Sequence, residues 1–75
     1  MNGIIFDYSL LEARIDERYG TREAFAKALG VPESILRRWL GNLRYWPHDQ
    51  MEKAVKLLEI QDAEVGDYFF RRMVP

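Results

Sequence analysis

Residues 21–41, TREAFAKALGVPESILRRWLG, decide the fold of this chain. Thr21 is a favourable helix N-cap, and apolar residues follow it at the spacing of one helix face. Gly30 ends this first helix, because glycine adopts the left-handed conformation at little cost. Pro32 suits the first turn of a second helix, which runs to Leu40. The stretch therefore predicts two short helices joined by a three-residue turn, which is the spacing of a helix-turn-helix motif.

Helical periodicity continues on both sides of this motif. We expect a helix over residues 9–19, capped by Asp7 or Ser9, and another that begins near His48. Asp62 is then expected to cap a last short helix over residues 63–70. The fold class is therefore all-α, a compact bundle of four to five helices. Only Ile4-Ile5-Phe6 could be extended, against the Tyr68-Phe69-Phe70 end.

Length and composition indicate one small globular domain, residues 1–75. The chain is 48% hydrophobic and 31% charged, has no cysteine, and has no apolar stretch long enough to cross a bilayer. A disulfide framework and a thiolate metal site are therefore excluded. The N-terminal residues lack the basic and apolar regions of a signal peptide, so we expect a cytoplasmic protein.

Charge is unevenly distributed, although the net charge is only −1. Residues 22–48 contain five basic and two acidic side chains, whereas residues 59–67 contain four acidic side chains and no basic one. A net charge this low argues against an indiscriminate polyanion binder. The positive middle is the part of the chain suited to a nucleic acid.

Residues for catalysis are scarce. His48 is the only histidine, Ser9 and Ser34 are the only serines, and no glycine-rich phosphate loop is present. We therefore expect no enzyme activity, no catalytic residue, no bound metal, no cofactor and no small-molecule ligand.

The segment resembles the lambda-repressor-like superfamily of phage Cro, repressor and xenobiotic-response-element-type regulators. The residues that carry this resemblance are Thr21, Phe25-Ala26, Leu29-Gly30-Val31, Leu36 and Trp39, with residues 51–60 similar to the family's fourth helix. The two ends of the chain also resemble very small regulators encoded by phages and prophages. This sequence departs from the family pattern at Pro32, where the family often has serine, and in the bulky connector of residues 43–47. It implies a transcriptional regulator that reads a DNA operator with its third helix in the major groove.

The exposed face of that helix supplies the candidate DNA contacts. Ser34, Arg37 and Arg38 lie opposite its apolar stripe, and arginine forks there would pair with guanine. Glu33 could accept from cytosine or could simply complement the helix dipole. Arg22 and Arg44 are the predicted phosphate contacts, although Arg44 is equally well explained as a loop charge.

A second interpretation is a protein-binding module, an antirepressor or modulator that keeps the helix-turn-helix fold but binds another regulator. The two interpretations differ in whether the positive middle or the aromatic and acidic tail carries binding.

In the connector of residues 43–47, we expect Tyr45 and Trp46 to pack beneath the loop rather than to contact DNA.

Apolar residues at the two ends of the chain lie outside the motif, and we predict that they form a homodimer. The candidate contacts are Phe6, Tyr68, Phe69 and Phe70, together with Ile4, Ile5, Tyr8, Val65, Met73 and Val74. The alternative is that these residues close the core of the monomer, because a small domain needs every apolar side chain that it has.

Overall fold

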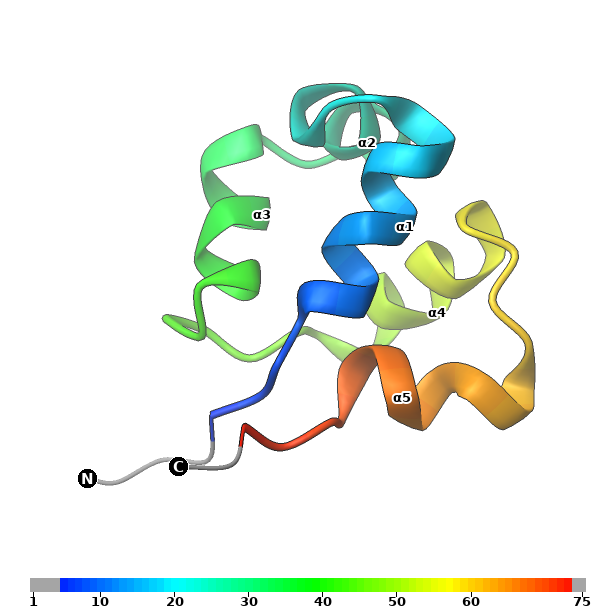
Figure 1. Cartoon of the computed structure of the whole chain (residues 1–75). Helices are drawn as coiled ribbons and strands as arrows, with labels where there is room; N and C mark the ends of the chain where they lie inside the picture. Colours follow the sequence, from blue (N-terminus) through cyan, green and yellow to red (C-terminus); the bar gives the residue numbers. More distant parts are fainter. Residues whose placement is uncertain (1–4, 74–75) are drawn as a thin grey trace.

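Five α-helices and one 3₁₀ turn form the computed structural model, which describes residues 5–73 (Figure 1). In chain order they are α1 (Ser9–Tyr19), α2 (Arg22–Leu29), α3 (Glu33–Leu40), α4 (His48–Leu57), η1 (Asp62–Glu64) and α5 (Val65–Phe69). Helix α1 packs against α2 and α5, and α2 packs against both α3 and α4. The predicted all-α fold is therefore confirmed. Of the helices in residues 5–73, none has the length and apolar character needed to cross a membrane.

Helix α2 begins and ends at the residues expected from the sequence, after Thr21 and before Gly30. The Thr21 hydroxyl accepts a hydrogen bond from the Ala24 backbone N–H at 3.1 Å, which satisfies one of the free donors of the first turn. Gly30 takes a left-handed conformation with φ 87°, and its N–H donates to the Ala26 carbonyl at 2.8 Å. The chain can therefore reverse within three residues and start α3 at Glu33.

The core is a single cluster of apolar side chains drawn from every α-helix. Its buried members are Tyr8, Leu11, Ile15, Phe25, Ala26, Leu29, Leu36, Trp39, Leu40, Trp46, Ala54, Leu58, Ile60 and Phe69. Most of the residues that helical periodicity places on the inner face of α1, α2 and α3 are indeed buried, but Ala28, predicted on the inner face of α2, is exposed, and Tyr19 of α1 is half-buried. Around this cluster, aromatic rings contact each other in tilted and edge-to-face pairs, the geometry that their quadrupoles favour.

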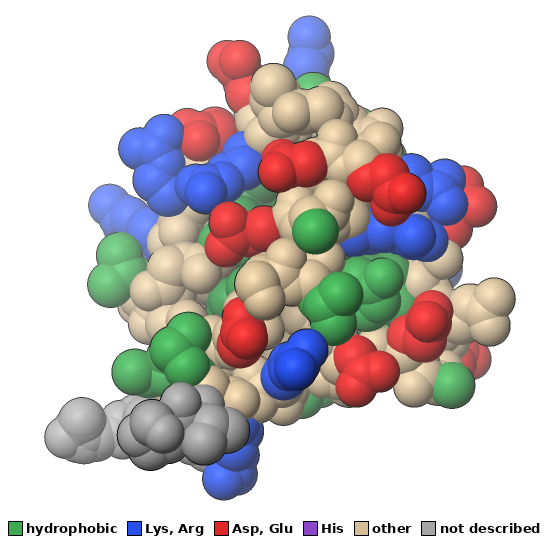
Figure 2. Space-filling model, in the orientation of Figure 1, with side chains coloured by type: hydrophobic (Ala, Val, Ile, Leu, Met, Phe, Trp, Pro, Cys, Tyr) green, Lys and Arg blue, Asp and Glu red, His purple; other side chains and the backbone are tan. Residues whose placement is uncertain are grey.

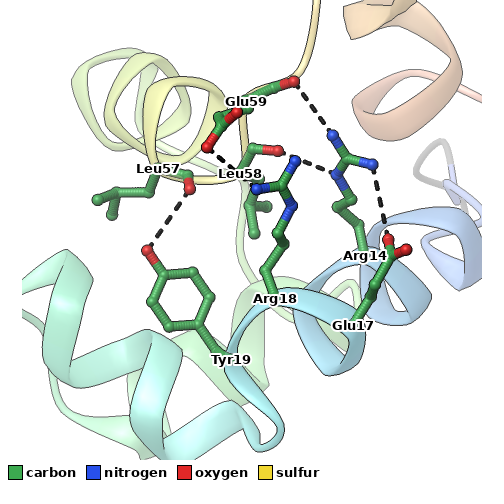
Figure 3. Close-up of polar contacts among 7 residues, drawn as sticks. All are labelled: Arg14, Glu17, Arg18, Tyr19, Leu57, Leu58 and Glu59. Carbon is green, nitrogen blue, oxygen red and sulfur yellow. Dashed lines mark hydrogen bonds and ion pairs between the residues drawn. The ribbon is translucent and has the colours of Figure 1, made fainter.

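Polar side chains of α1 bind the C-terminal end of α4, although about 40 residues separate them (Figure 3). Arg14 donates from Nε to the Leu58 carbonyl at 2.9 Å and from Nη2 to the Glu59 carbonyl at 3.2 Å. Arg18 forms an ion pair with the Glu59 carboxylate at 3.0 Å. The last carbonyls of a helix lack intrahelical partners, and cations are favoured at this end of the helix dipole. These contacts therefore cap α4 and fix it against α1.

The two ends of the described chain lie side by side. Phe6 and Arg72 form an isolated antiparallel bridge, flanked by hydrogen bonds from Asp7 N to Arg71 O at 2.7 Å and from Met73 N to Ile5 O at 3.0 Å. The expectation of an extended N-terminal segment is correct for residues 5–6, and Ile4 lies outside the described residues. The N-terminal segment was expected to pair with residues 68–70, but it pairs with residues 71–73, because residues 68–70 form the end of α5 and its C-cap.

Two local predictions were wrong at helix starts. Asp62 is not a cap but the first residue of η1, whose N-cap is Gln61, and the predicted helix over 63–70 is divided into η1 and α5. Before α1, Tyr8 occupies the cap position without a side-chain hydrogen bond, whereas the Asp7 carboxylate accepts from Ser9 N at 2.9 Å. This hydrogen bond, with a smaller contribution from Arg71, lowers the pKa of Asp7.

Candidate functional site

Helices α2 and α3, with the turn between them, form the predicted two-helix unit, and α3 presents a polar face to solvent. Leu36, Trp39 and Leu40 are buried against the core. Their burial leaves Ser34, Arg37 and Arg38 exposed, as the spacing predicted. The structure therefore brings these three side chains to one surface, where a macromolecule could reach them.

Arg37 is already engaged within its own helix. Its Nη2 lies 2.7 Å and 2.9 Å from the two carboxylate oxygens of Glu33, one helical turn earlier. The pair is exposed, so it contributes little to stability. It nevertheless places a carboxylate directly on the predicted reading face, beside the guanidinium that was expected to contact guanine.

The two predicted phosphate contacts have different environments. Arg22, the first residue of α2, forms an ion pair with Glu12 of α1 at 3.3 Å, so its charge is partly balanced. Arg44 is exposed and lies just beyond α3, where its backbone N–H donates to the Arg38 carbonyl at 3.3 Å. Arg44 and Arg38 therefore lie close together at the C-terminal end of α3.

In the connector after α3, the prediction for Trp46 is correct and the prediction for Tyr45 is wrong. Trp46 is 7% exposed and packs on Trp39, as expected, with ring centroids 4.9 Å apart. Tyr45, which was expected to pack beneath the loop, is instead 78% exposed, and Leu43 is 76% exposed. Leu43, Arg44 and Tyr45 are all exposed and only Trp46 is buried, and a loop has no fixed period from which this difference between Tyr45 and Trp46 could be predicted.

Basic and hydrophobic side chains occur next to each other on the side of the molecule that α3 occupies. Figure 2 shows both kinds at the left edge of the view, with acidic side chains beside the basic ones at the upper left, while basic and acidic side chains are also mixed on the right.

The predicted dimer contacts are divided between core and surface. Phe69 is 1% exposed and packs edge-to-face on Trp46, so its assignment as a dimer contact was wrong: α5 turns this ring into the core of the monomer. Phe70, the next residue, is 51% exposed, and Phe6 and Tyr68 are half-buried against the core. Ile5 and Met73 are about half exposed, whereas Ile4 and Val74 lie outside the described residues.

Within residues 5–73, no group of three His, Cys, Asp or Glu side chains could hold a metal ion.

Comparison with known proteins gives two findings. A family described as "Protein of unknown function (DUF739)" matches residues 4–72. Among solved structures, the chain is similar to the modulator of repression (MOR) of the temperate bacteriophage TP901-1 from Lactococcus lactis, with a TM-score of 0.77 and 37% sequence identity. This similarity covers 87% of the present chain and 88% of the MOR chain. No protein with a curated description matches.

These findings support the predicted relationship to small phage regulators, whereas the narrower assignment to the lambda-repressor-like superfamily stays a prediction. The family match extends over nearly all of the folded residues, from the segment before α1 to the bridge at Arg72. This chain therefore belongs to the DUF739 family.

Proposed function

We propose that this chain modulates phage repression by binding another regulatory protein, the second of the two interpretations given by the sequence. The observation that carries the proposal is the 37% identity to a phage modulator of repression, extending over 87% of this chain. An identity this high over almost the whole fold favours a related role. The proposed function needs no catalytic group, metal or cofactor.

The charges on α3 also favour a protein partner over DNA. Most of the affinity of proteins for DNA comes from neutralising phosphates with basic side chains. Here the net charge is −1, and the Glu33 carboxylate lies 2.7 Å from Arg37 on the face that would enter the groove. A duplex would have to approach this carboxylate and compete with it for the guanidinium.

Operator recognition is the second candidate, and a specific observation favours it. The short turn between α2 and α3 leaves Ser34, Arg37 and Arg38 exposed on one face of α3. In helix-turn-helix proteins this is the helix that contacts base edges. On this hypothesis the chain binds two operator half-sites as a homodimer.

Two binding measurements with the full chain distinguish the candidates. The first is calorimetric titration into the repressor encoded by the same phage genome, and the second is selection from a randomised duplex DNA pool at near-physiological salt. We expect saturable binding to the repressor and no enriched DNA motif. A symmetric enriched motif without repressor binding would replace the proposal by operator recognition, and failure of both measurements would reject both functions.

Arg37 gives a sharper test of operator recognition. If Arg37 reads a base, Arg37→Ala weakens binding to the selected site by about 1–3 kcal/mol and relaxes selectivity at one position. For a phosphate contact such as Arg44, the loss is uniform across DNA sequences and lowers the salt slope by about one. If both variants bind every duplex as the unaltered chain does, α3 is not a reading helix.

A further inference from the structure

The segment Leu43–Tyr45 between α3 and α4, hereafter the α3–α4 loop, carries the two most exposed large hydrophobic side chains of residues 5–73. Leu43 is 76% and Tyr45 is 78% exposed, whereas the others in this class reach at most 55%. Single exposed apolar residues are common on protein surfaces. Two of them on either side of an arginine, in one short loop, form a local surface that the fold itself does not use.

The backbone of this loop is held in place at its start. The N–H groups of Leu43 and Arg44 both donate to the Arg38 carbonyl, at 2.9 Å and 3.3 Å. Asn42 adopts a left-handed conformation with φ 62°, which asparagine tolerates better than most residues. Its side-chain amide forms two hydrogen bonds with the Phe6 backbone, accepting from N at 3.0 Å and donating to O at 2.9 Å. The loop is thereby tied to the N-terminal segment.

Trp46 holds the other end of the loop. It is 7% exposed, and its ring lies 4.9 Å from that of Trp39 and 5.1 Å from that of Phe69. Leu43 and Tyr45 therefore point outward because the chain on either side is fixed. A surface organised in this way loses little conformational entropy when a partner binds.

The charges beside these apolar side chains indicate the chemistry of the partner. Arg38 and Arg44 are exposed, and neither forms an ion pair within the part of the chain that the structure describes. Tyrosine and arginine are among the residue types enriched at the energetic hot spots of protein interfaces. Carboxylates on the partner would complement the two guanidinium groups.

From these observations we infer that the α3–α4 loop, together with Arg38, is a docking surface for a protein segment that carries apolar side chains flanked by carboxylates. This inference rests on the proposed function and names the surface that performs it. A DNA duplex is less suited to this surface, because phosphates offer no apolar contact to Leu43 or Tyr45.

The test uses the full chain and the repressor encoded by the same phage genome, with affinity measured by calorimetric titration. Leu43→Ser/Tyr45→Ser removes the apolar contacts, and Arg38→Glu/Arg44→Glu reverses the charges. We expect each double variant to bind at least about tenfold more weakly, since single interface hot spots exceed this effect. Leu10→Ser and Lys27→Glu alter an exposed apolar side chain of α1 and an exposed basic side chain of α2, and we expect them to bind as the unaltered chain does. Thermal unfolding checks that every variant is folded.

The outcomes separate this inference from the proposed function. If the unaltered chain does not bind the repressor, the proposed function fails and this inference fails with it. If the unaltered chain binds and both double variants bind equally well, only the docking surface is wrong. The two double variants alter different side chains, so one folded variant is enough to decide. Loss of binding to a selected DNA duplex, with repressor binding unchanged, would assign the surface to nucleic acid and overturn the inference.

Discussion

Phe69 and Phe70 are adjacent in sequence but occupy opposite environments, one in the core and one at the surface. We expect Phe69→Ala to lower the free energy of unfolding by about 3–5 kcal/mol, because it removes a buried ring and leaves a cavity. Phe70→Ala should cost roughly 1 kcal/mol or less, since this ring is 51% exposed and packs edge-to-face on Phe6 at the surface. Urea unfolding of both variants measures the difference. Equal losses for the two substitutions would mean that α5 is rotated relative to the described packing.

Tyr8 gives the fold a dependence on alkaline pH. Burial raises the pKa of its phenol, because the charged phenolate is poorly solvated there. Since the folded-state pKa lies above the unfolded value of about 10, this group's stabilisation is complete below pH ~10 and is lost as the pH rises through the folded-state pKa. We expect Tyr8→Phe to unfold less readily than the unaltered chain above about pH 10 in urea titrations.

At the scale of elements, the contacts of α1 with the end of α4 are unequal. Arg14 donates to two main-chain carbonyls and its side chain is only 23% exposed, whereas the Arg18–Glu59 ion pair is more open to solvent. We therefore expect Arg14→Ala to cost roughly 1–3 kcal/mol, and Arg18→Ala about 0–1 kcal/mol. Chemical denaturation of the two variants provides the comparison. A larger loss for Arg18→Ala would show that the ion pair, not the carbonyl capping, fixes α4.

Helices whose ends depend on neighbouring residues could be predicted from the sequence. Thr21 and Gly30 act within a few residues, through hydrogen bonds and backbone preference, so α2 and its turn follow from local chemistry. The orientation of Leu43 and Tyr45 depends instead on the amide of Asn42 meeting Phe6, 36 residues away. The Glu33–Arg37 ion pair could have been predicted from its spacing of four residues, yet Glu33 was assigned to a cytosine contact or to the helix dipole, and Arg37 to a guanine contact. Long-range contacts therefore set the part of the candidate site that the sequence did not reveal.

At the scale of the whole molecule, the homodimer stays a prediction with fewer candidate residues. Ile5, Phe70 and Met73 are each about half exposed near the paired ends, and a second copy could cover them. We expect sedimentation of the unaltered chain to show dimers at high concentration, and Phe70→Ser to remain folded but monomeric. A chain that is monomeric at every concentration tested would exclude this interface.

The pairing of residues 5–7 with 71–73 has a consequence for how the chain can be connected. Because the Met73 N–H donates to the Ile5 carbonyl at 3.0 Å, a short peptide could join the two ends while the helices keep their places. The chain could then be opened elsewhere, for example at the exposed Gln61 between α4 and η1. Such a circular permutant should give the same far-ultraviolet circular dichroism spectrum and a cooperative melt. In this fold the order of the helices along the chain is therefore separable from their arrangement in space.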